Sequence, residues 1–102
     1  MAVKTHTFDA ALYLEDDADA LGYLEEAMKI AQEDGNPSFL TVALGTVARA
    51  RGMSQIAKDA GLSRESLYKA LGAEGNPEFG TVLKVLQALG LKLSVQKQGT
   101  AA

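Results

Sequence analysis

Apolar residues recur at spacings of three and four along most of the chain before Gly90, as they do in amphipathic helices packed on one core. Within residues 19–32 this stripe consists of Leu21, Leu24, Met28 and Ala31. Acidic residues crowd the start of this segment and Lys29 lies near its end, an arrangement that the helix dipole favours. The pattern therefore predicts a helix over residues 19–32.

Five further helices are predicted from apolar spacing and from residues typical of helix ends. They cover residues 9–14, 37–51, 54–60, 64–71 and 77–89. Asn36 suits an N-cap and Pro37 suits the first helical position, where proline loses no hydrogen bond. Asn76 and Pro77 repeat this pair, which indicates the same helix-start chemistry used twice rather than a duplicated unit.

The period changes after Gly90, where apolar and polar residues alternate as in a half-buried strand. The apolar positions of this segment, residues 91–96, are Leu91, Leu93 and Val95. A lone strand needs a partner, either in a second copy or in a different protein; chance alternation in a frayed tail is the alternative. Residues 97–102 are expected to be disordered.

The length of 102 residues suits one domain with a single core. The predicted fold is all-α with a short C-terminal β-strand. Within it we distinguish an acidic N-terminal helical segment (1–35), a helix-turn-helix domain with the strand (36–96) and the tail (97–102). Zero cysteines exclude disulfides, thiolate zinc sites and thiol nucleophiles, and one histidine cannot supply a cluster of metal ligands.

The sequence does not support a membrane protein, a secreted protein or an enzyme. No run approaches the roughly 18 apolar residues of a membrane span, and residues 1–14 lack the pattern of a secretory signal, so a cytoplasmic location is expected. The neighbouring acids of residues 16–17 and 25–26 diverge on a helix and form no acid–base pair. We therefore expect neither an enzyme nor a bound cofactor or metal.

The net charge of −3 conceals two unlike halves. Residues 1–48 carry two lysines and nine acids, whereas residues 49–102 carry eight basic residues and four acids. The first half therefore repels phosphate, and its acidic face suits a basic protein partner. The second half is able to approach phosphate, although solvated faces that merely differ would give the same count.

The most informative segment is residues 53–71, which predicts two short helices joined by a tight turn. Gly61 supplies the positive φ that ends the first helix, Leu62 fills the corner and Ser63 caps the second helix. The side chains expected to pack in the core, on the inner faces of the two helices, are those of Ile56, Ala57, Ala60, Leu67, Ala70 and Leu71. This is the pattern of a helix-turn-helix whose second helix enters the major groove of DNA, or of a structural helical hairpin.

The same residues resemble the HigA-type antitoxins, the small antidote proteins of bacterial addiction modules. The resemblance rests on residues 48–54, 61–71 and 75–77, and on residues 8–11 and 23–27 of the first half. It implies a lambda-repressor-like helical domain that forms a homodimer, represses its own operon and neutralises a toxin, commonly RelE/ParE-like. The alternatives are a stand-alone transcriptional regulator and a protein-interaction module that does not bind DNA.

The candidate DNA-binding residues lie at the starts of the two short helices and on the outer face of the second. They are Ser54, Gln55, Ser63, Arg64, Glu65, Ser66, Tyr68 and Lys69. Arg64 is placed to read guanine or to hold phosphate, and Lys69 to bind phosphate or to pair with Glu65. Glu65 either accepts a hydrogen bond from cytosine or repels DNA.

The polar candidates have structural alternatives. Ser66 and Tyr68 offer hydroxyls to phosphate, although the Tyr68 ring can instead pack on the helix surface. Ser54 and Gln55 bring backbone amides to phosphate; the alternatives are that Ser54 only caps its helix and that Gln55 braces the second helix.

Overall fold

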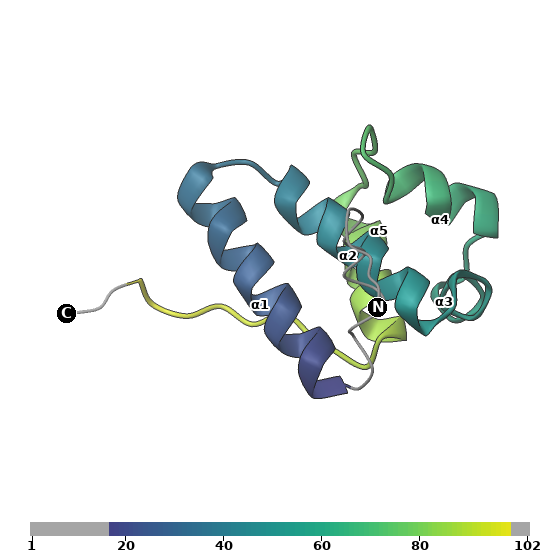
Figure 1. Cartoon of the computed structure of the whole chain (residues 1–102), viewed down its shortest axis with the longest axis horizontal. Helices are drawn as coiled ribbons and strands as arrows, with labels where there is room; N and C mark the ends of the chain where they lie inside the picture. The colour runs from purple at the N-terminus through teal and green to yellow at the C-terminus, as the bar shows by residue number, and fades with distance from the viewer. Residues whose placement is uncertain (1–16, 99–102) are drawn as a thin grey trace, which may run out of the picture.

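The computed structural model describes residues 17–98. These residues form α1 (Asp17–Asp34), α2 (Ser38–Arg51), α3 (Met53–Ala60), α4 (Arg64–Ala70) and α5 (Phe79–Ala88). α1 packs along α2, and α3 contacts α2, α4 and α5. Figure 1 shows α2 between α1 on one side and α3 and α4 on the other. The predicted helices of residues 19–89 are therefore present, with ends that shift by one or two residues.

The core is built from the apolar stripes of all five helices. Its largest fully buried side chains are Leu44, Leu67, Val47 and Val85. Gly45 of α2 lies so close to α4 that a Cβ atom there would stand 2.7 Å from the carbonyl oxygen of Leu71. In α1 the predicted stripe is only partly correct, because Leu24 and Ala31 are buried but Leu21 is 42% exposed.

The connection between α1 and α2 is closed by Asn36. Its backbone N–H donates to the carbonyl of Ala31 (2.9 Å), and its side-chain oxygen accepts from the backbone N–H of Ser38 (3.0 Å). Gly35 permits the turn with φ 66°. Asn36 therefore closes the turn before α2, but the expected N-cap is displaced by one residue: Pro37 occupies the N-cap position, without a side-chain cap, and regular helix begins at Ser38.

The second Asn-Pro pair does not start a helix in the same way. α5 begins at Phe79, and Glu78 precedes it with extended backbone (φ −64°, ψ 155°) and no side-chain cap. The prediction that Pro77 opens this helix is therefore wrong. The physical reason is that the extended backbone of Glu78 separates Pro77 from the first helical turn.

The predicted β-strand over residues 91–96 is also wrong, because residues 17–98 contain helices but no strand. The backbone N–H of Leu91 donates to the Leu86 carbonyl (2.8 Å) at the end of α5, and its side chain packs on the core. Leu93 is 37% exposed and Val95 is 99% exposed. The alternation therefore does not mark one buried face, and residues 17–98 contain no strand with which this segment could pair.

Two predicted segments lie wholly or partly outside the described residues. They are the helix of residues 9–14 and the tail, of which residues 99–102 are not described. Among the helices of residues 17–98, none combines the length and the hydropathy needed to cross a membrane.

Candidate nucleic-acid interface

The turn between α3 and α4 is fixed by backbone hydrogen bonds around Gly61. This residue adopts a left-handed conformation (φ 74°, ψ 30°). Its N–H donates to the Lys58 carbonyl (3.1 Å), and the N–H of Leu62 donates to the Ala57 carbonyl (2.8 Å). These two bonds form a Schellman motif, which satisfies the last carbonyls of α3 and turns the chain sharply.

Ser63 sets the start of α4, as the sequence predicts. Its backbone is extended (φ −73°, ψ 154°), and its Oγ accepts from the backbone N–H of Ser66 at 3.0 Å. The Ser63 hydroxyl also donates to the Ser66 Oγ at 2.8 Å. Because the Ser63 hydroxyl is used twice within the protein, Ser66 is the better placed of the two to donate a hydrogen bond outward.

The inner faces of α3 and α4 hold the motif on the domain. Leu67 is completely buried (0% exposed), and Ile56 and Ala57 of α3 are 4% and 2% exposed. The small side chain of Ala57 suits the close crossing of the two helices. The predicted burial is confirmed for these positions, whereas Ala70 is only half-buried.

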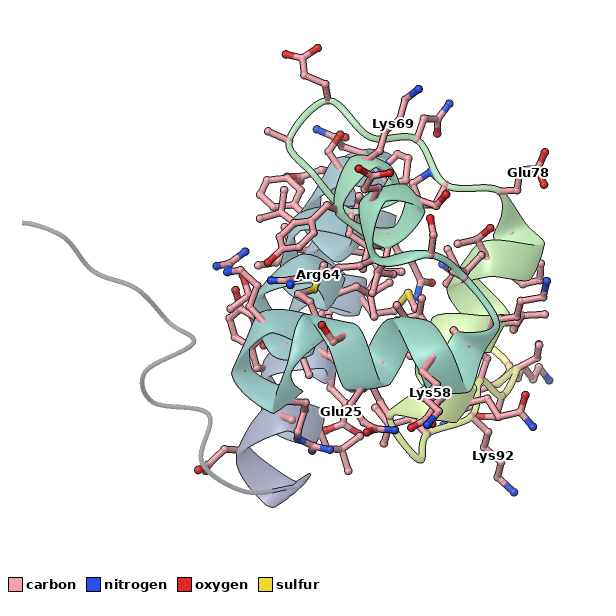
Figure 2. All side chains as sticks on the ribbon, turned by 90° about the vertical axis from the view of Figure 1, so that its right-hand side faces the viewer. Glu25, Lys58, Arg64, Lys69, Glu78 and Lys92 are labelled. Atoms are coloured by element: carbon pink, nitrogen blue, oxygen red, sulfur yellow. The ribbon has the colours of Figure 1, made fainter. Side chains whose placement is uncertain are left out.

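All eight candidate residues are exposed on α3, on the turn or on α4. Ser54 and Gln55 lie in the first turn of α3, which begins at Met53, so Ser54 is not its N-cap. Figure 2 looks toward this side of the molecule and labels Arg64 and Lys69 on α4. The structure thus presents the eight side chains on two consecutive helices and the turn between them.

Two of the candidates contact each other. The Arg64 guanidinium lies over the Tyr68 ring, 5.4 Å from its centroid, and one of its nitrogens donates to the Tyr68 hydroxyl at 3.4 Å. This stacking orients a planar donor group that still has further N–H groups for a ligand. Gln55 does not brace α4, because its side-chain amide donates to Asp59 of its own helix (2.9 Å).

Charge distinguishes this side of the molecule from α1. Residues 49–71 have a net charge of +3, whereas α1 has six acids and one lysine, a net charge of −5. The basic residues of this segment are Arg49, Arg51, Lys58, Arg64 and Lys69. Arg49, Arg51 and Lys58 were not among the candidate residues, although the charge count of their segment pointed to them. A negatively charged ligand is therefore favoured here.

Within residues 17–98, no three His, Cys, Asp or Glu side chains are grouped so that they could hold a metal ion. The fold and this site together define a small protein that is all-helical over its described residues and that exposes two short helices joined by a tight turn.

Comparison with known proteins narrows this class to one family. The model of a family described as "Probable addiction module antidote protein" matches residues 4–97. An uncharacterised protein of Haemophilus influenzae is 50% identical over 97 residues, which cover 95% of this chain and 96% of that protein. No solved structure matches. The chain therefore belongs to the family of probable addiction module antidote proteins.

The predicted resemblance to addiction-module antidotes is confirmed at this level, while the matched description does not specify the HigA type. Membership of an antidote family implies a cognate toxin as partner.

Proposed function

We propose that this protein is a DNA-binding antitoxin that represses its own toxin–antitoxin operon and neutralises a RelE/ParE-like toxin, as HigA-type antitoxins do. The observation that carries the DNA-binding part is the exposed, basic helix α4, held by the Gly61 turn and the Ser63 cap. In helix-turn-helix proteins, the first turn of the second helix reaches the base edges in the major groove. Arg64 occupies that position.

The exposed side chains of α4 divide into base-reading and phosphate-binding groups. The Arg64 guanidinium, oriented by Tyr68, is able to bond the O6 and N7 atoms of a guanine together. Lys69 and the Ser66 hydroxyl suit phosphate oxygens, which position the protein but carry no sequence information. Two copies in a homodimer would place their α4 helices about 34 Å apart, one turn of DNA.

A gel-shift assay with the DNA upstream of the protein's own gene tests this proposal. We expect a shifted complex that unlabelled DNA of the same sequence removes and unrelated DNA of the same length does not. Equal competition by both DNAs, or no complex at all, would contradict sequence-specific binding. In the second case the acidic first half would favour the alternative of a protein-interaction module that does not bind DNA.

Replacing Arg64 with Ala is expected to reduce base preference more than overall affinity. The discrimination of one guanine should fall by about 1–3 kcal/mol, which is about 5- to 150-fold. Competition with operator DNA carrying single base changes measures this. Lys69→Ala is the matched control, because removing a phosphate-binding charge should weaken all sequences alike. Unchanged base preference in Arg64→Ala would remove the assigned role.

A further inference from the structure

A second surface lies between α1 and the first half of α2, and it contains none of the candidate DNA-binding residues. It is a groove of about 450 Å³, here called the α1–α2 groove. Its lining residues are Tyr23, Glu26, Ala27, Ile30, Asn36, Ser38, Phe39, Val42 and Ala43. Glu26 is the one charged residue among them. The groove is therefore an apolar surface that carries a single negative charge.

The apolar side chains of the groove are unusually accessible. Phe39 is 44% exposed and Val42 is 47% exposed, although both belong to a helix whose other face is fully buried. Tyr23 and Ile30 of α1 are half-buried beside them. Apolar patches of this kind on a folded protein are typical of sites that bind another molecule.

Carboxylates follow the same face of α1 as the groove. Asp19 lies four residues before Tyr23, Glu26 lies between Tyr23 and Ile30, and Asp34 lies four residues after Ile30. Residues three and four apart are neighbours on a helix surface, so this spacing places the three acids on the side of α1 that carries Tyr23 and Ile30, and Glu26 among them lines the groove. Figure 1 shows α1 on the side of α2 away from α3 and α4, the segment that carries the positive charge.

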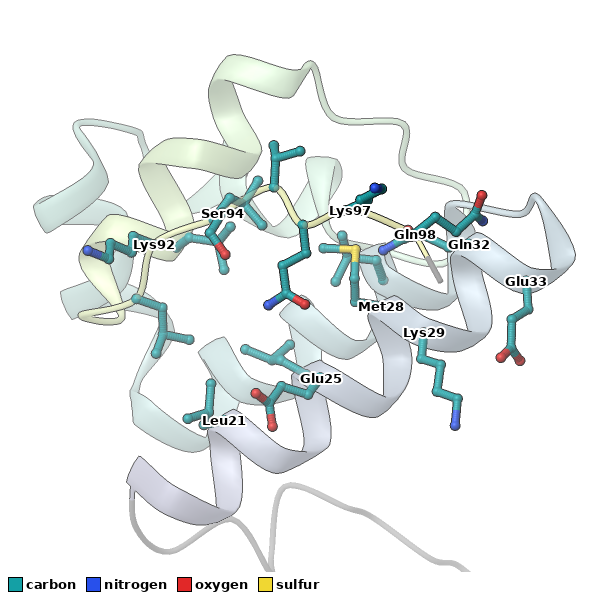
Figure 3. Close-up of a pocket in the computed structure, with 17 residues that line it drawn as sticks. Leu21, Glu25, Met28, Lys29, Gln32, Glu33, Lys92, Ser94, Lys97 and Gln98 are labelled. Atoms are coloured by element: carbon teal, nitrogen blue, oxygen red, sulfur yellow. The ribbon is translucent and has the colours of Figure 1, made fainter. Parts of the chain in front are cut away.

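A second cavity, along another face of α1, lacks this uniform sign. It lies under the segment that follows α5, and its lining includes Glu25 and Glu33 but also Lys29, Lys92 and Lys97 (Figure 3). The charges of that cavity can offset one another within the chain. Of the two cavities, the α1–α2 groove is the one that combines exposed apolar side chains with a lining whose one charged residue is an acid, Glu26.

We propose that the α1–α2 groove binds a toxin segment that is apolar on one side and basic on the other. This inference rests on the proposed antitoxin function and names the surface that function would use. The negative charge of Glu26 and of α1 indicates which kind of molecule the groove binds. A second copy that paired groove to groove would bring another α1 of net charge −5, residues 1–16 carry a net charge of −2, and DNA is a polyanion. A basic amphipathic segment, by contrast, buries its apolar side on Phe39 and Val42 and places cations beside Glu26.

The test measures binding of the protein encoded by the adjoining gene, purified and titrated calorimetrically into the full chain. The double variant Phe39→Ala/Val42→Ala should weaken binding by about 30-fold or more, because exposed anchors in an apolar groove dominate such interfaces. The control is Phe79→Ala/Leu83→Ala, which removes two exposed apolar side chains of α5, 67% and 42% exposed. It should change binding by less than about threefold.

A second pair of variants tests how much the negative charge of the groove contributes to toxin binding. Glu26→Lys reverses a charge in the groove, and Glu25→Lys makes the same change at the next residue, which lines the other cavity. Glu26→Lys should weaken binding by about tenfold or more, and Glu25→Lys by much less. DNA binding and thermal melting of every variant show that the domain remains folded.

The outcomes separate this inference from the proposed function. If the wild-type chain binds the adjoining gene product and all variants bind within about threefold of it, the groove assignment is overturned while the antitoxin function stands. If the wild-type chain does not bind at all, both are overturned. If the groove variants instead dissociate an oligomer of this chain, a second copy occupies the groove and the inference fails.

Discussion

Leu67→Ala is expected to lower the free energy of unfolding by about 2–5 kcal/mol, the range for truncating a buried leucine. Leu67 is completely buried and is the one fully buried residue within α4. Its removal leaves a cavity between α4 and the core, and a helix of seven residues has little stability of its own to offset the loss. Urea unfolding followed by circular dichroism measures the change.

Leu83→Ala is the control for this prediction. It makes the same truncation on α5 at a side chain that is 42% exposed. We expect a cost below about 1 kcal/mol, because the side chain is only partly packed and no cavity forms. Equal costs for the two variants would show that α4 is not held by Leu67. The Leu67→Ala protein should also bind operator DNA more weakly, since α4 would no longer be fixed at one angle.

The affinity for operator DNA is expected to fall by about 10³–10⁵-fold between about 50 and 200 mM salt. This range applies to proteins that bind about six to ten phosphates, and each neutralised phosphate releases counterions from the DNA. Two copies of the segment of residues 49–71, each with five basic residues and two acids, would supply that number. Equilibrium binding at a series of salt concentrations gives the slope of log affinity against log salt.

Two lysine variants locate the positive charges behind this slope. Lys58→Gln removes an exposed positive charge on α3, and the slope should fall by about 0.9 for each phosphate that the protein no longer neutralises. Lys92→Gln removes an exposed charge after α5, beside the cavity of Figure 3, and should leave the slope unchanged. A flat salt dependence of the wild-type protein would contradict phosphate binding by this surface.

The turn between α3 and α4 was predictable from sequence because the residues that determine it act locally. Gly61 and Ser63 act through hydrogen bonds to residues at most five positions away, so their residue types alone specify the turn. The burial of Leu67 followed from helical spacing. The orientation of Arg64 by Tyr68 depends on a four-residue spacing too, but many side-chain arrangements satisfy that spacing, and the sequence did not select one.

The features that were predicted wrongly from the sequence, or not predicted at all, depend on packing between segments that are not neighbours along the chain. Alternation at Leu93 and Val95 is typical of a strand only where a second strand pairs with it, and the described chain provides none. The exposure of Phe39 and Val42 depends on how α1 packs on α2, and Leu21 borders the cavity beside the segment that follows α5. A stripe of apolar residues does not reveal which of its members the neighbouring helix leaves uncovered.

α2 connects the α1–α2 groove with the basic segment of residues 49–71. Its first turns carry Phe39 and Val42, and its last turn carries Arg49 and Arg51. As an uninterrupted helix of 14 residues it is about 21 Å long, and a tilt of about 5° at one end moves the other by about 2 Å. A partner protein that tilted the first end of α2 on binding would therefore displace the Arg49 and Arg51 side chains at the other end by a similar distance.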